Sequence, residues 1–137
     1  MPVGFSVKHL TEIPLVPKDK AHDPDWHAVQ HYFSLSAYGV NAYVAPEAGI
    51  ELVSEHDELR SRQEELYFVS SGRARFALDG EEFDAPAGTF VAVRDPAIRR
   101  AAVAEEPGTT ILAVGARPTG PFVSTWDKRH FEDVPRL

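Results

Sequence analysis

The sequence contains no cysteine among its 137 residues. This absence excludes disulfide bridges, zinc sites built from thiolates and a cysteine nucleophile. It suits a reducing cytoplasm, which is the location we expect. The first ten residues lack the basic start and apolar run of a signal peptide. No stretch reaches the roughly 18 consecutive apolar residues of a membrane span, so we predict no membrane contact.

Basic side chains are also scarce. Fourteen lysines and arginines stand against twenty-one acidic residues, which gives a net charge of −7. Such a surface repels phosphate backbones, and the only basic clusters are pairs such as Arg60/Arg62. The sequence also lacks a glycine-rich phosphate loop and a Gly-x-Ser-x-Gly motif. These absences exclude the phosphate-loop and serine-hydrolase classes, and we expect no nucleic-acid partner.

The remaining composition predicts one domain of many short strands. A length of 137 residues with 43% apolar content is enough for one core, and eleven prolines with nine glycines favour short elements. Apolar β-type runs alternate with turn signals about every 8–12 residues, the pattern of an all-β sandwich or barrel. We expect a single domain over 1–137, with a core barrel over about 28–116, an N-terminal strand and loop over 1–27, and a C-terminal tail or short helix over 117–137. The expected strands are 28–36, 40–45, 50–55, 65–71, 74–79, 81–85, 89–94, 99–106 and 109–116.

The clearest local pattern is a hairpin over residues 73–86. Asp79 and Gly80 form a two-residue turn whose positions both tolerate positive φ. In the strand before it, Ala74 and Phe76 share one face, and the arginines share the other. The pattern therefore predicts a half-buried strand.

Two glycine-based spacings identify a family. Six residues separate Glu65 from Gly72, and fifteen residues separate Gly72 from Gly88. From Gly49 to Val114 the chain resembles the cupin superfamily, whose members carry two such motifs joined by a hairpin. The resemblance implies an all-β fold, a cupin-type jelly-roll β-barrel of two antiparallel sheets.

The metal-binding histidines of the two motifs are largely replaced. Counting back from Glu65, the first two should fall near 58–61, where the chain has Glu58, Leu59, Arg60 and Ser61. His56 can serve as the first histidine only if its loop is two or three residues longer than usual, and Glu58 then takes the place of the second. Counting eleven residues from Gly88 places Arg99 at the third.

The resemblance implies that Glu65 points into the barrel, with Tyr67 on the same face. Because the motif-two histidine and the glutamate of cupins share one metal, Arg99 is expected near Glu65. It would either pair with that carboxylate or bind an anionic ligand. The alternative is that Arg99 faces outward and is solvated. The predicted ligand-binding residues are Glu65, Arg99 and Tyr67.

A metal site stays open as an alternative. His56, Glu58 and Glu65 together offer one imidazole and two carboxylates, a donor set for iron, manganese or zinc. The competing interpretation is a surface histidine in the charged loop 55–65. Arginine is never a metal ligand, so the leading expectation is no cofactor.

Three functions follow from these patterns. The first is a small cytoplasmic cupin whose metal site has degenerated and which binds a small molecule in the barrel, with anions among the candidates. The second is a metal-dependent enzyme of dioxygenase or isomerase type that uses His56, Glu58 and Glu65. The third is a structural or regulatory dimerisation module. Whether the protein is an enzyme stays open, and a homodimer through outward apolar residues of one sheet is the expected assembly.

Overall fold

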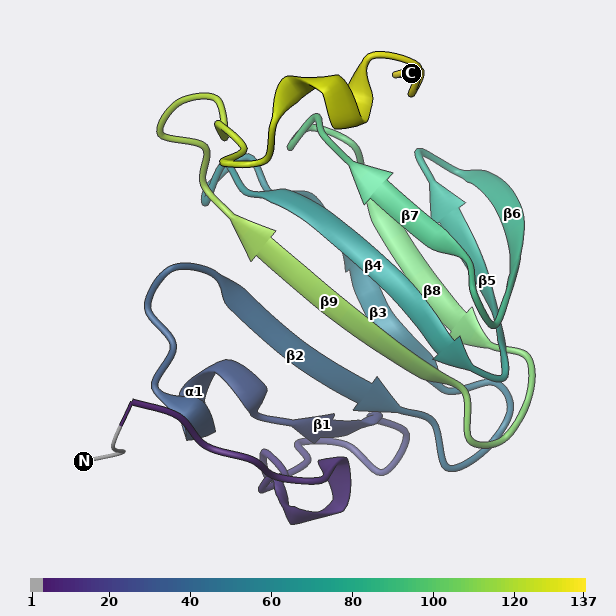
Figure 1. Cartoon of the computed structure of the whole chain (residues 1–137). Helices are drawn as coiled ribbons and strands as arrows, with labels where there is room; N and C mark the ends of the chain where they lie inside the picture. The colour runs from purple at the N-terminus through teal and green to yellow at the C-terminus, as the bar shows by residue number, and fades with distance from the viewer. Residues whose placement is uncertain (1–3) are drawn as a thin grey trace.

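The computed structural model describes residues 4–137 and contains two antiparallel β-sheets packed face to face (Figure 1). The strand order is β1-β2-β9-β4-β7 in the five-stranded sheet and β3-β8-β5-β6 in the four-stranded sheet. This arrangement is a jelly-roll barrel, as the turn spacing and the resemblance predicted. The strands are Asp25–His27 (β1), Gly39–Val44 (β2), Glu51–His56 (β3), Glu64–Ser71 (β4), Arg73–Leu78 (β5), Glu81–Pro86 (β6), Phe90–Val93 (β7), Arg100–Ala104 (β8) and Thr110–Ala116 (β9).

The core lies between the two sheets. Tyr67 and Val69 of β4 point inward, and Phe76 of β5 and Ile111 of β9 meet them, all at most 2% exposed. Along each strand these inward residues alternate with outward ones, because successive side chains of a strand point to opposite faces. Burying a large apolar side chain is worth about 1.5–3 kcal/mol. These contacts hold the strands that carry the candidate site.

The hairpin of β5 and β6 is confirmed. Asp79 and Gly80 connect the two strands with φ values of 50° and 83°. Ala74 and Phe76 are fully buried, whereas Arg73 and Arg75 on the opposite face are exposed. The half-buried strand therefore has the predicted face inward.

The strand predicted over 28–36 is wrong. Val29–Phe33 form the short helix α1, which Ser34 ends with a left-handed φ of 55°. The helix packs against β2, whose outward residues Val40 and Ala42 are buried. The need to cover that strand outweighs the β-propensity of valine, tyrosine and phenylalanine, a tertiary override of local preference.

The N-terminal segment is mostly irregular. The strand expected over residues 4–16 is not formed: Leu15 makes one isolated bridge with His27, and the short strand β1 comes only after the loop. A 3-10 turn over Leu10–Glu12 (η1) is capped by His9, whose backbone N–H donates a hydrogen bond to the Glu12 carboxylate at 2.7 Å. The segment between η1 and β1 then runs beside the open end of the barrel.

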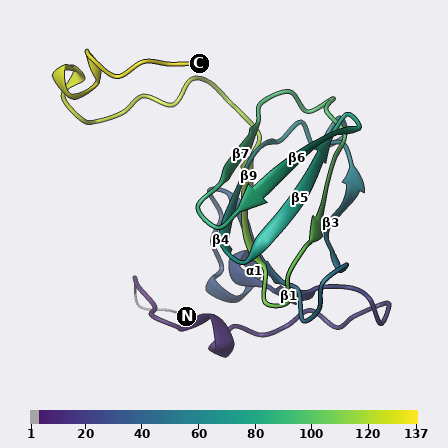
Figure 2. The same ribbon diagram turned by 90° about the vertical axis from the view of Figure 1, so that its right-hand side faces the viewer.

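The C-terminal segment leaves the barrel after β9 (Figure 2). Its one regular element is a 3-10 turn over Lys128–Phe131 (η2), capped by Asp127. Ser124 does not cap this turn, although its hydroxyl accepts a hydrogen bond from the Trp126 amide at 3.1 Å. The short helical turn was one of the two expected forms, whereas a tail lying over the barrel is not formed. Within residues 4–137, none of the helices is long and apolar enough to cross a membrane.

Candidate functional site

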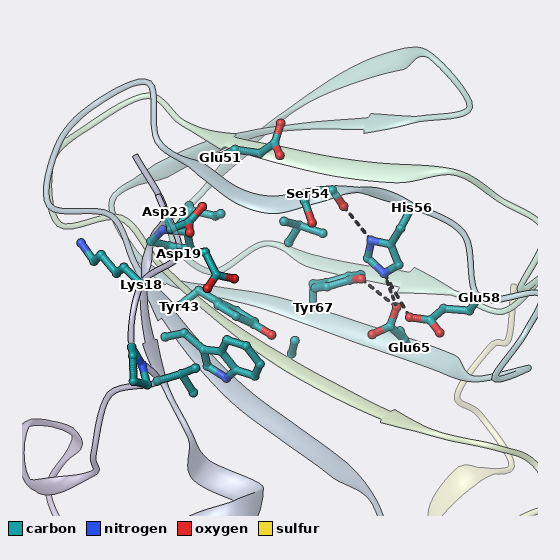
Figure 3. Close-up of a pocket in the computed structure, with 17 residues that line it drawn as sticks. Lys18, Asp19, Asp23, Tyr43, Glu51, Ser54, His56, Glu58, Glu65 and Tyr67 are labelled. Atoms are coloured by element: carbon teal, nitrogen blue, oxygen red, sulfur yellow. Dashed lines mark hydrogen bonds and ion pairs between the residues drawn. The ribbon is translucent and has the colours of Figure 1, made fainter. Parts of the chain in front are cut away.

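A cavity of about 380 Å³ opens between the two sheets. Strand β3 and the segment 16–26 supply most of its lining, and β2, β4 and β9 add one or two residues each (Figure 3). Glu65 and Tyr67 project into it from β4, and His56 and Glu58 approach them from β3 and the loop that follows. Four of the five predicted site residues therefore meet at one place.

Glu65 is the central carboxylate of this cavity. Its side chain is 12% exposed, and its Oε1 accepts a hydrogen bond from the Tyr67 hydroxyl at 2.8 Å. On β9, Gly115 lies directly opposite Glu65. A Cβ at Gly115 would come within 3.2 Å of Glu65 Cγ and 2.6 Å of Gln63 Oε1. The missing side chain at Gly115 thus makes room for the inward carboxylate.

Arg100 provides the charge partner of Glu65. Its Nη1 donates to Glu65 Oε1 at 2.7 Å, and its Nε and Nη2 donate to the Ile98 carbonyl at 3.0 and 2.9 Å. The arginine side chain is fully buried. Its inward neighbours on β8, Ala102 and Ala104, are small, which leaves space for the long side chain. Glu65 and Arg100 form a buried, hydrogen-bonded ion pair.

The predicted contact between Arg99 and Glu65 is not formed. The Arg99 side chain is 50% exposed and lies 3.5 Å from carboxylate oxygens of Glu55 and Asp57. Strand β8 begins at Arg100, one residue later than the family spacing from Gly88 indicates. Because the side-chain period of a strand is two, a shift of one residue exchanges the inner and outer faces. The inward arginine was therefore predicted one position too early.

His56 is held from both sides of its ring. Nδ1 lies 2.7 Å from the Ser54 carbonyl, which can only accept, so Nδ1 carries a hydrogen. Nε2 then points to Glu58 Oε1 at 3.0 Å and lies 3.8 Å from Glu65 Oε1. The other carboxylate oxygen of Glu58 accepts a hydrogen bond from the Ser61 hydroxyl. The imidazole and both carboxylates are thus oriented toward one point.

The donor atoms of His56, Glu58 and Glu65 all lie within 4.8 Å of one another, close enough to hold a metal ion. The contact of Nδ1 with a backbone carbonyl orients the ring so that Nε2 faces the two carboxylates, as the corresponding contacts of metal-binding histidines do. Against a metal stands the guanidinium of Arg100, which contacts the same Glu65 oxygen as Tyr67. A divalent ion bound at Glu65 would face this buried positive charge, and one of the two Glu65 oxygens already accepts two hydrogen bonds. The three donors are therefore present, but their surroundings fit a cation poorly.

The two tyrosines of the cavity stay protonated. Burial, followed by the charge of Glu65, raises the pKa of Tyr67 far above its usual value. The same two causes raise the pKa of Tyr43. Because its phenol is neutral, Tyr67 can donate the hydrogen bond that Glu65 accepts.

An aromatic and acidic wall completes the cavity, and sequence reasoning did not anticipate it. Trp26 of β1 pairs with Tyr43 of β2, their ring centroids 6.0 Å apart. Asp19 and Asp23 come from the segment beside them, and Lys18 is bonded to Asp25 at 2.9 Å. The sequence signal is the polar run 17–25, which predicts a loop. Only the fold shows that this loop lines the cavity.

Solved structures share this fold at low sequence identity. The chain superposes on a cupin protein from Bacteroides fragilis with a TM-score of 0.62 and 18% identity, covering 90% of this chain and 98% of that one. For KdgF from Halomonas sp. the TM-score is 0.65 and the identity 15%, covering 83% of this chain and 94% of that one. For PAC13 from Streptomyces, solved with uridine, the TM-score is 0.60 and the identity 19%, covering 85% of this chain and 86% of that one.

No protein-family model matches the sequence, and no curated protein sequence matches it either. The two-sheet jelly roll places the chain in the class of small β-barrels with an open end between the sheets. Together with the structural neighbours, it shows that the chain has the cupin fold.

Proposed function

We propose that this protein binds a small polar molecule in the barrel cavity without a resident metal. The observation that carries the proposal is the fully buried Arg100 guanidinium on Glu65, 2.7 Å away. In cupins the equivalent glutamate binds a metal ion. Here its charge is balanced by the protein itself, so the site needs no metal to compensate the buried carboxylate. The cytoplasmic location of the protein stays a prediction.

The charge of the cavity wall favours a neutral or cationic ligand over the anion first considered. Arg99, which was expected to bind an anion, lies outside the cavity, and Arg100 forms an ion pair with Glu65. Lys18 on the rim is bonded to Asp25, while Asp19 and other carboxylates remain on the wall. An anion would therefore meet net negative charge.

The aromatic pair supports the same ligand class. The rings of Trp26 and Tyr43 offer a surface on which a sugar ring, a base or a cationic group can pack. Glu58 and Glu65 provide acceptors for hydroxyl or amino groups at the inner end of the cavity. Uridine, bound by the structural neighbour PAC13, is neutral and carries hydroxyl groups. It is a suitable first probe.

We expect neutral nucleosides, polyols or amines, and not carboxylic acids, to raise the melting temperature of the protein. A ligand at a hundredfold excess over its Kd stabilises by about 2.7 kcal/mol. Trp26→Ala should remove most of this stabilisation because it deletes the aromatic wall. Tyr38→Ala is the matched control, because Tyr38 is exposed and does not line the cavity. Stabilisation by acids alone, or equal loss in both variants, would contradict the proposed ligand class.

The second candidate, a metal-dependent enzyme, is favoured by the convergence of His56, Glu58 and Glu65. Metal analysis of protein purified without a metal-affinity tag distinguishes this enzyme from the metal-free binding protein proposed above. We expect substoichiometric iron, manganese and zinc, because Arg100 disfavours a cation at Glu65. Stoichiometric metal that is lost in His56→Ala would establish the enzyme-type site instead. The third candidate, a purely structural module, has less support because side chains leave the cavity open.

A further inference from the structure

The outer face of the five-stranded sheet carries an apolar patch, here called the apolar face. The strand register places Phe68 of β4 between Phe90 of β7 and Leu112 of β9, with Leu66 and Val114 beside them. Phe90 is 64% exposed and Leu66 40%, and the rings of Phe68 and Phe90 are stacked with centroids 4.5 Å apart. Contiguous apolar patches of this kind mark interaction sites.

Only part of this sheet is covered by the chain itself. Helix α1 packs over β2, where Val40 and Ala42 are buried. Over β4, β7 and β9, the described residues 4–137 leave the apolar face accessible to solvent. The outer face of this sheet is therefore covered over β2 and exposed over β4, β7 and β9.

Residues 117–137, here called the C-terminal arm, also expose apolar side chains to solvent. Phe122 is 93% exposed and Trp126 69%, and together with Phe131 they line an apolar hollow within the arm. In Figure 2 the arm extends away from the barrel on the side where β4, β7 and β9 lie, opposite β3. A body seated on the apolar face would lie next to the arm.

Charge favours a second copy of the chain as that body. The arm has four basic and three acidic residues, a net charge of +1, so the remainder of the chain carries −8 of the total −7. An arm is thus attracted to the barrel of another copy, and it reduces the repulsion between two acidic barrels. The charged residues of the arm are Arg117, Asp127, Lys128, Arg129, Glu132, Asp133 and Arg136.

The available area is sufficient for a stable pair. A buried aromatic side chain removes about 150–250 Å² from water. Phe90, Phe122 and Trp126 in each of two copies therefore contribute on the order of 1,000 Å². Leu66 and the aliphatic residues of the arm add to this, which brings the total into the range of about 1,200–2,000 Å² for specific interfaces.

We propose that two copies of this chain form a two-fold dimer through the apolar face, with each C-terminal arm packed on the barrel of the other copy. In such an isologous interface the same patch serves both subunits, so one apolar face and one arm per chain satisfy each other. The arrangement buries both features that the single chain leaves in water. It does not depend on what the cavity binds.

The assembly can be measured by light scattering after size exclusion and by sedimentation velocity of the full chain. We expect a species of twice the chain mass of 15.2 kDa. Phe90→Asp and Trp126→Asp should each weaken the dimer at least tenfold, because each places a charge in the apolar contact. Val103→Asp is the matched control, since Val103 faces outward from β8 in the other sheet. Far-UV circular dichroism checks that each variant is folded.

The position of the arm is tested by tryptophan fluorescence. The chain has two tryptophans, so Trp26→Phe leaves Trp126 as the single reporter. We expect acrylamide to quench Trp126 weakly in the dimer and strongly after dilution or in the added Phe90→Asp background. A monomer at all concentrations would overturn the proposal, as would a dimer in which Trp126 stays fully quenchable. Trp126 protected in a monomer would show that the arm folds onto its own barrel, which also overturns it.

Discussion

Replacing Arg100 with methionine is expected to lower the free energy of unfolding by about 3–5 kcal/mol, because it leaves the Glu65 carboxylate buried beside an apolar side chain. The arginine is fully buried and Glu65 is 12% exposed, so solvent compensates little for the lost partner. Urea denaturation followed by circular dichroism measures the change.

The adjacent arginine provides the control for this prediction. Arg99 is half exposed and contacts Glu55 and Asp57 at 3.5 Å, so Arg99→Met should cost less than about 1 kcal/mol. Combining Arg100→Met with Glu65→Gln should recover much of the loss, since the buried charge is removed together with its partner. Equal costs at positions 99 and 100 would mean that the inward arginine has been assigned to the wrong residue.

If Arg100→Met does not yield folded protein, Arg100→Lys still tests the pair. Lysine keeps the charge but loses the fork that also donates to the Ile98 carbonyl. An intermediate loss of stability is then expected. A lysine variant as stable as the parent would show that charge alone, and not the arginine geometry, holds Glu65.

Replacing Gly72 with alanine should be comparably damaging, by about 2–6 kcal/mol. Gly72 has a φ of 75°, which costs a residue with a side chain about 1–3 kcal/mol. Its added Cβ would also lie 2.6 Å from Thr109 Cα, and such overpacking costs about 1–3 kcal/mol more. Thr109 cannot easily move, because it is fully buried and its hydroxyl is bonded to the Glu106 carbonyl at 2.7 Å.

Gly80 separates the two causes. Its φ of 83° is similar, but a Cβ there meets no atom within 4 Å. Gly80→Ala should therefore show the backbone cost alone, and the difference between the two variants in urea denaturation measures the close approach to Thr109. Similar losses at both positions would contradict tight packing between Gly72 and Thr109.

The part of the site that sequence predicted well lies on a strand with strong alternation. Around β4, inward Tyr67 and Val69 define the parity, and Glu65 follows from it at the strand entrance. Strand β8 has no such signal. Its sequence RAAVA is apolar on both faces after the first residue, so nothing local shows which of two adjacent arginines points inward.

The cavity wall formed by Trp26, Tyr43 and the segment beside them was beyond sequence reasoning for a different reason. Trp26 and Tyr43 are adjacent because β1 pairs with β2, yet the helix between these strands was predicted as a strand itself. Contacts between residues so far apart depend on the course of the connecting chain, which local propensity does not describe.

The sequence by itself determined the class of fold, the hairpin turn at Asp79 and Gly80, and the carboxylate at Glu65, since turn chemistry and two-residue periodicity are local properties. It also showed that most metal-binding histidines are replaced. Only the tertiary structure decided that Arg100, and not Arg99, balances Glu65, and that an acidic, aromatic wall faces the cavity. The physical reason is that strand register and loop path are set by packing between distant segments, and a shift of one residue reverses the face on which a charge lies.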